Sequence, residues 1–205
     1  ELDRASRSLA AYLQQLPGMQ PGDRVAVMMP NILQYPIAVA AILRAGLVLV
    51  NVNPLYTARE LEHQLKDSGA KAIFIIENFA HTLEQCLAQT DVRHIVLASM
   101  GDRMGGLKGA LINFVVRKVK KMVPAYQLPA TVRFNEAVAR HAPSALREVT
   151  PGPDDLAALQ YTGGTTGVAK GAMLLHRNIL SNVLQCEAWY QPGLTRRQLN
   201  HQIGF

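Results

Sequence analysis

Short apolar runs that alternate with helical patterns are the feature that most limits how this chain can fold. Turn-forming residues bound each run, and the four clearest runs are apolar on both faces: 25–29, 47–52, 72–76 and 94–98. Runs of this kind are typical of buried strands in a parallel sheet. The sequence therefore predicts an α/β fold in which parallel-rich sheets are covered by helices.

The segments between the runs have helical signals. A helix is predicted over 31–44, where Pro36 is tolerable only near the first turn and Gly46 is placed to cap the C-terminal end. Thr57-Ala58-Arg59-Glu60 fits a capping box at the start of the next helix. A further helix is predicted over 78–89.

Composition sets the size of the core and excludes some classes of protein. The 205 residues are 49% apolar, which is enough to bury a substantial core in one large domain or two small ones. Most of the net charge of +6 lies between residues 101 and 125, so a nucleic-acid footprint across the whole protein is not expected. Two distant cysteines, Cys86 and Cys186, suggest buried thiols in a reducing cytoplasm.

The ends of the chain predict a piece of a longer protein. Glu1 already lies in a helical pattern, and neither an initiator methionine nor a signal peptide precedes it. The longest apolar run, 37–50, is interrupted by Arg44 and is shorter than the roughly 20 residues that a membrane span needs. The stretch 142–154 contains three prolines and a glycine and is the best candidate for a linker.

One loop carries the clearest chemical signal. A strand predicted over 156–161 leads into Thr162–Gly171, which holds four glycines, three threonines and one lysine in ten positions. Glycines let backbone N–H groups approach and surround an anion, threonine hydroxyls donate to phosphate oxygens, and Lys170 supplies a cation. A nucleoside triphosphate is the ligand that this set fits. The alternative, a glycine-rich hairpin turn, fits poorly because ordinary hairpin loops have about 2–5 residues.

The two commonest phosphate motifs do not match this loop. The Walker A pattern requires Ser or Thr after the lysine, whereas Gly171 follows Lys170. The dinucleotide pattern GxGxxG does not fit the doublet Gly163-Gly164. The apolar stretch 172–175 follows at once, so we expect the loop to join two strands of a hairpin and a helix to begin near His176.

The stretch Tyr161–Leu174 closely resembles the AMP-binding signature of adenylate-forming enzymes, and Val168-Ala169-Lys170 with His176-Arg177-Asn178 resembles their bacterial long-chain fatty-acyl branch. Ala169 stands where the family usually has proline. The segments 21–25 and 44–56 also resemble that family's first subdomain. The resemblance implies an ATP phosphate site made of Tyr161, Thr162, Gly163, Gly164, Thr165, Thr166, Gly167, Val168, Ala169, Lys170, Gly171 and Ala172.

The same resemblance implies a two-step reaction. A fatty-acid carboxylate attacks the α-phosphorus of ATP and expels pyrophosphate, with Mg²⁺ neutralising the leaving group, and the thiol of CoA then displaces AMP. Residues 1–150 would form an α/β subdomain of the large N-terminal domain, and 151–205 would start a second subdomain. The family's catalytic lysine, its Mg²⁺ site and its C-terminal domain would lie beyond this chain, so the chain alone is expected to be inactive and to hold no catalytic residue or metal ligand.

A basic amphipathic stretch over 107–123 admits two interpretations. It either packs its apolar side on the core with its lysines solvated, or lies on an anionic membrane. The second interpretation would place a cytoplasmic enzyme on the inner face of the cell membrane. Besides fatty acid, ATP and CoA as partners, exposed edges of a truncated sheet favour association as a homodimer.

Three other functions compete with the fatty-acyl interpretation. An adenylate-forming ligase could act on an aryl or short-chain acid instead. The chain could also belong to a non-catalytic nucleotide-binding module. A basic membrane- or nucleic-acid-binding protein ranks last, because it leaves the glycine- and threonine-rich loop unexplained.

Overall fold

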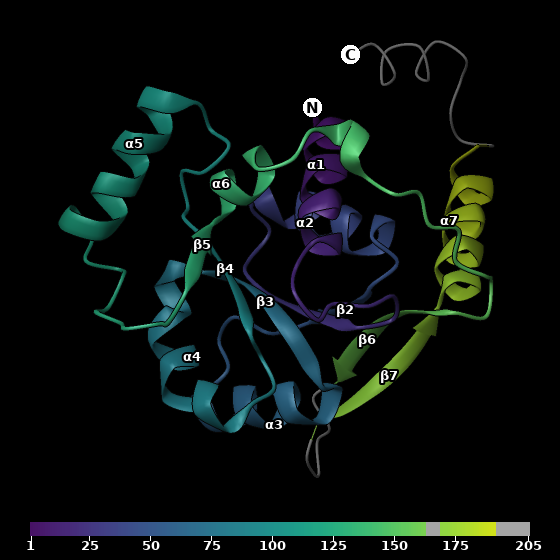
Figure 1. Cartoon of the computed structure of the whole chain (residues 1–205), viewed down its shortest axis with the longest axis horizontal. Helices are drawn as coiled ribbons and strands as arrows, with labels where there is room; N and C mark the ends of the chain where they lie inside the picture. The colour runs from purple at the N-terminus through teal and green to yellow at the C-terminus, as the bar shows by residue number, and fades with distance from the viewer. Residues whose placement is uncertain (163–168, 192–205) are drawn as a thin grey trace.

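A computed structural model describes residues 1–162 and 169–191, which form one seven-stranded sheet with helices packed on both faces (Figure 1). The strands in chain order are β1 (Arg24–Met28), β2 (Val48–Asn51), β3 (Ala70–Ile76), β4 (His94–Ala98), β5 (Thr131–Arg133), β6 (Leu156–Thr162) and β7 (Lys170–Leu175). Their order across the sheet is β5-β4-β3-β1-β2-β6-β7. All neighbours pair in parallel except β6 and β7, so the predicted α/β fold with a parallel-rich sheet is confirmed.

The helices divide between the two faces of the sheet. One face is covered by α1 (Leu2–Gln14), α2 (Gln34–Arg44) and α6 (Phe134–Ala139), and the other by α3 (Ala58–Ser68) and α4 (Ala80–Cys86) (Figure 1). The five strands from β2 to β5 across the sheet have the doubly wound order 2-1-3-4-5. In sheets of this kind ligands bind beyond the carboxyl ends of the strands.

Two separate apolar cores explain why the strands are apolar on both faces. Val25 and Val27 of β1 face the core under α1 and α2, whereas Ala26 and Met28 face the core under α3 and α4. Phe74 of β3 meets Phe134 of α6 edge to face in the first core, with ring centroids 6.0 Å apart. The continuous apolar runs of the sequence thus correspond to strands that are buried on both sides.

Local signals in the sequence determine several helix ends. Thr57 caps α3 through the predicted capping box with Glu60, whose carboxylate accepts the Thr57 N–H at 2.8 Å. Gly46 follows α2 with φ of 75°, and a side chain there would run into Val149. A left-handed residue at this position is what a helix C-terminus favours, and glycine adopts it without strain.

Two predicted helices differ from those observed. The helix expected from Asn31 begins at Gln34, which leaves Pro36 in its first turn, where proline is tolerated. The helix expected over 78–89 is a short α4 between two 3₁₀ turns, Glu77–Phe79 and Leu87–Gln89. In the first turn the Asn78 side chain donates to the Met122 carbonyl at 2.9 Å, a contact with a distant segment that the local pattern does not reveal.

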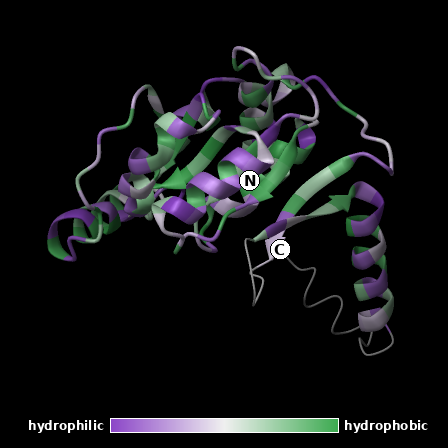
Figure 2. Cartoon of the chain, turned by 90° about the horizontal axis from the view of Figure 1, so that it is seen from below, coloured by the Kyte–Doolittle hydropathy of each residue, from purple (hydrophilic) through white to green (hydrophobic). Residues whose placement is uncertain are grey.

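The last two strands, β6 and β7, extend the same sheet beyond β2. β6 pairs with β2. α7 (His176–Tyr190) follows β7 and stands apart from the other helices (Figure 2), and none of its residues is buried. The division of the chain near residue 150 stays a prediction. Between β4 and β5, α5 (Gly106–Phe114) continues into a π-helical turn (Val115–Val119), and a short 3₁₀ turn (Pro143–Ala145) follows α6.

The helices and the two cysteines can be compared with what the sequence predicted. No helix within residues 1–162 and 169–191 is long and apolar enough to cross a membrane. Cys86 is buried, as predicted, whereas Cys186 is exposed on α7. The expectation of two buried thiols was therefore wrong for Cys186, because α7 has no neighbouring element over that face among the described residues.

The capping box of α3 gives a test of local structure. Thr57→Ala is expected to lower the free energy of unfolding by about 1 kcal/mol, because an N–H at the start of the helix loses its acceptor. Thr57→Ser keeps the hydroxyl and should retain most of the stability. Urea denaturation of the three proteins measures the difference, and equal midpoints for Ala and the parent would contradict the assignment.

Candidate nucleotide-phosphate site

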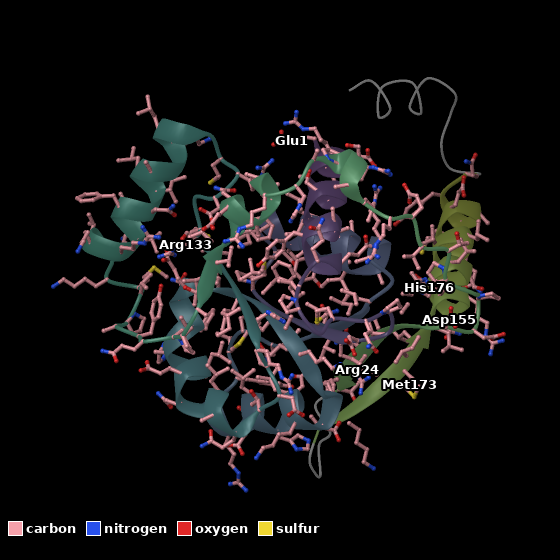
Figure 3. The ribbon with its side chains drawn as sticks, in the orientation of Figure 1. Glu1, Arg24, Arg133, Asp155, Met173 and His176 are labelled. Atoms are coloured by element: carbon pink, nitrogen blue, oxygen red, sulfur yellow. The ribbon has the colours of Figure 1, made fainter. Side chains whose placement is uncertain are left out.

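The predicted phosphate loop lies between two paired strands. β6 and β7 are antiparallel, with Thr162 opposite Lys170 and Tyr161 opposite Gly171. The expected hairpin and the helix beginning at His176 are confirmed, and Figure 3 places His176 near Asp155, whose carbonyl accepts the His176 N–H at 3.0 Å. Six of the expected site residues lie outside the described residues: Gly163, Gly164, Thr165, Thr166, Gly167 and Val168.

The hairpin stands at the edge of the sheet where ligands are expected. Because β1, β2 and β6 are parallel neighbours, their carboxyl ends open on the same side. A hollow of about 460 Å³ lies there, lined by residues that follow β1 and β2 and by Gln160 and Tyr161 of β6. Thr162 and Lys170 pair at the end of the hairpin where the loop connects the strands, and this end lies at the same edge of the sheet as the hollow.

Tyr161 fixes the hairpin to α3. Its hydroxyl donates a hydrogen bond of 2.5 Å to the Asp67 carboxylate. Its ring lies against Gly171, where an added Cβ would come within 3.0 Å of the ring carbons. Burial, and after it the hydrogen bond to Asp67, raises the pKa of the Tyr161 phenol well above its usual value. Gly171 is therefore needed for close packing, and the phenol stays neutral and donating over the physiological range.

A chain of amide and hydroxyl groups lines the floor of the hollow. The Tyr35 hydroxyl donates to Asn51 Oδ1 at 2.9 Å, and Asn51 Nδ2 donates to Gln160 Oε1 at 3.0 Å. Gln64 of α3 donates to the Asn51 carbonyl at 2.7 Å. These bonds join α2, β2, α3 and β6 directly beneath the hairpin, and fixed dipoles of this kind can orient a bound nucleotide.

Sequence reasoning missed these four residues. Asn51 and Gln160 are polar positions at the carboxyl ends of otherwise apolar strands, which was the available signal. The contacts of Tyr35 and Gln64 join segments that are distant in the chain, so no local pattern pointed to them.

The remaining described site residues lie in or next to β7, the second strand of the hairpin. The His63 Nε2 of α3 lies 3.3 Å from the carbonyl oxygen of Ala169. Lys170 and Ala172 are exposed, and a lysine is a flexible cation suited to bind phosphate. Ala169 thus contributes a backbone contact to α3.

The donor set near the hairpin suits an anion better than a metal ion. Thr162 offers a hydroxyl and Lys170 a cation, whereas the Asp67 carboxylate already accepts from Tyr161. Over residues 1–162 and 169–191, no group of three or more His, Cys, Asp or Glu side chains is arranged to hold a metal. Mg²⁺ beside a nucleotide usually binds through one or two carboxylates together with the phosphate oxygens and water.

Comparison with known proteins points to one family. Residues 1–201 match the AMP-binding enzyme family. The chain is 58% identical over 196 residues to a long-chain-fatty-acid–CoA ligase of Escherichia coli O157:H7, a match that covers 95% of this chain and 35% of that protein. The chain therefore spans about a third of the length of this curated relative.

Solved structures agree in fold. A long-chain-fatty-acid-CoA ligase from Archaeoglobus fulgidus superposes with a TM-score of 0.68 at 26% identity, covering 89% of this chain and 31% of that one. ATP-bound MatB from Rhodopseudomonas palustris gives a TM-score of 0.70 at 26% identity, covering 93% of this chain and 32% of that one.

The bond between Tyr161 and Asp67 gives a test at alkaline pH. Tyr161→Phe is expected to lower the free energy of unfolding by about 1 kcal/mol at neutral pH, because a hydrogen bond to a carboxylate is lost. The raised pKa of the folded phenol means that its stabilising contribution is present below the ordinary phenol pKa near 10 and is lost as pH rises through the folded value.

Denaturation curves from pH 7 to 11 measure this difference. The parent protein should lose stability above about pH 10 more steeply than Tyr161→Phe, since only the parent has this phenol to ionise on unfolding. Tyr126→Phe serves as a tyrosine control, because Tyr126 is only partly buried. Parallel pH profiles for the parent and Tyr161→Phe would contradict the assignment.

Proposed function

The chain belongs to the AMP-binding enzyme family, and from that membership we propose that the full-length protein activates long-chain fatty acids to acyl-CoA through an acyl adenylate. The observation that supports nucleotide binding is the pairing of Thr162 with Lys170 at the loop end of the hairpin, on the carboxyl edge of the sheet. The 58% identity to a long-chain-fatty-acid–CoA ligase carries the choice of acid.

The proposed role of the hairpin is to bind the β- and γ-phosphates of ATP. We assign this role to Thr162, Gly163, Gly164, Thr165, Thr166 and Gly167, with Lys170 as the cation. Negative charge moves onto the pyrophosphate as the carboxylate attacks the α-phosphorus, so N–H donors, hydroxyls and an ammonium placed there lower the barrier. Tyr161, held by Asp67, fixes the first strand of the hairpin and so keeps these donors in position.

The remaining reactants of the proposal are CoA and Mg²⁺. The thiol of CoA attacks the acyl carbon of the adenylate and releases AMP, which leaves the thioester as product. Mg²⁺ would bind with the nucleotide and neutralise its phosphates. From the resemblance to the family, we place the Mg²⁺ site in the part of the full-length protein outside this chain.

We also infer where in the cell the enzyme binds its fatty-acid substrate. A long-chain fatty acid partitions into membranes because each buried CH₂ group is worth about 0.8 kcal/mol. The proposed enzyme therefore works in the cytoplasm on acid drawn from the inner face of the cell membrane.

Pyrophosphate release by the full-length protein tests the proposal. With ATP and Mg²⁺, and acids from acetate to palmitate, release should be fastest with the long chains. Thr165→Ala combined with Lys170→Ala should lower kcat/KM about 10²- to 10³-fold, as expected when charge-stabilising donors are removed.

Lys66→Ala is the matched control, because Lys66 is an exposed lysine on α3 that pairs with Glu62. Release with aryl or short-chain acids alone would keep the adenylation reaction and reject the choice of acid. An absence of release with every acid would reject the enzymatic proposal in favour of a nucleotide-binding module without chemistry.

A further inference from the structure

The helix α5 and its π-helical turn present an apolar face to solvent. Both views show this segment projecting from the body of the molecule (Figures 1 and 2). Leu107, Leu111 and Phe114 are 92%, 63% and 57% exposed, and their spacing places them on one side of the helix. Of the two interpretations of this stretch, packing of its apolar side on the core does not agree with the exposure of these side chains.

The opposite side of the same helix is the one that contacts the protein. Gly109 lies so close to the Gly101 backbone that a side chain would collide with the Gly101 carbonyl oxygen. One turn later, Asn113 Oδ1 accepts the Gly101 N–H at 2.7 Å. Small and polar residues thus face inward, which turns the apolar side outward.

A buried ion pair fixes this orientation. Glu77, whose side chain is 2% exposed, accepts from Arg117 Nε at 3.0 Å and from Arg117 Nη2 at 2.8 Å. Arg117 Nη2 also donates to Ser99 Oγ at 2.8 Å, and Arg133 Nη1 lies 3.4 Å from Glu77 Oε2. Rotating the helix inward would remove the two-pronged contact of Arg117 and leave the buried Glu77 carboxylate with the longer Arg133 contact alone, which is costly.

All charged side chains within the segment that carries the exposed face are basic, while Glu1 and Asp102 line a hollow beside Gly106 and Ala110. From Arg103 to Asn135 the sequence contains no Asp or Glu. The exposed basic side chains of this stretch are Lys108, Lys118, Lys120, Lys121 and Arg133, of which Arg133 pairs with Glu77. Solvated lysines beside outward leucine and phenylalanine are typical of helices that lie at the surface of anionic membranes.

We propose that the α5 face, made of Leu107, Leu111, Phe114 and the lysines Lys108, Lys118, Lys120 and Lys121, binds the surface of an anionic phospholipid bilayer. The charge favours this occupant over a further part of the protein, because an apolar domain surface laid over the face would have to desolvate the lysines. The inference deepens the proposed function, since it supplies the surface through which the enzyme meets its acid.

Sedimentation of the full-length protein with vesicles tests the proposal without substrate. Binding to vesicles of phosphatidylglycerol and phosphatidylethanolamine should exceed binding to phosphatidylcholine and should weaken with salt. Lys118→Gln with Lys121→Gln should weaken binding roughly 30-fold, from about 1 kcal/mol for each basic residue near the surface. Leu111→Ser with Phe114→Ser should abolish retention at moderate salt.

Arg59→Gln with Arg93→Gln is the charge-matched control, since both arginines are exposed and lie outside this face. The control should bind vesicles like the parent, and all variants should keep the parent's melting temperature. Vesicle binding that ignores lipid charge would overturn the proposal. A large drop in melting temperature for Leu111→Ser with Phe114→Ser would also overturn it, because it would indicate that another segment of the protein covers this face. A shift of that variant from dimer to monomer would overturn it too, because it would indicate that a second copy of the chain covers the face. Pyrophosphate release in detergent is measured separately, so failure here leaves the proposed reaction untouched.

Discussion

The parallel pairing of β6 with β2 is the contact on which the candidate site depends. It aligns Leu49 with Ala158 and Asn51 with Gln160, although about 109 residues separate the partners in the chain. The pairing brings the hairpin to the carboxyl edge of the sheet and lets Tyr161 reach Asp67 on α3. Without it, the glycine- and threonine-rich loop would lack the rigid base that positioned phosphate donors require.

Local chemistry made much of this fold readable from the sequence. Strand 94–98 was predicted at its observed bounds, and the capping box at Thr57 set the start of α3, because apolar runs and capping side chains act over a few residues. The hairpin around Lys170 was likewise predicted, from the short apolar stretch 172–175 that follows the loop. The floor of the hollow was not, because the bonds from Tyr35 to Asn51 and from Asn51 to Gln160 depend on strand order, which pattern alone does not determine.

The orientation of α5 shows how a single buried charge can reverse an expectation based on amphipathicity. Periodicity alone places the apolar side inward. Here Glu77 has to be neutralised at the carboxyl edge of the sheet, and Arg117 does this only when the polar side of the helix faces the body. The ion pair between Glu77 and Arg117 thus connects the carboxyl edge of the sheet to α5, whose apolar face is proposed to meet a membrane.

The central claim is that a fatty-acid carboxylate attacks the α-phosphorus of a nucleotide bound at this hairpin. The fate of carboxyl oxygen reports that step directly. With palmitate labelled by ¹⁸O in both carboxyl oxygens, the full-length protein is predicted to release AMP that carries one ¹⁸O, because the acyl carbon–oxygen bond breaks when CoA attacks. Label in inorganic phosphate with formation of ADP, or no label in AMP, would contradict the account.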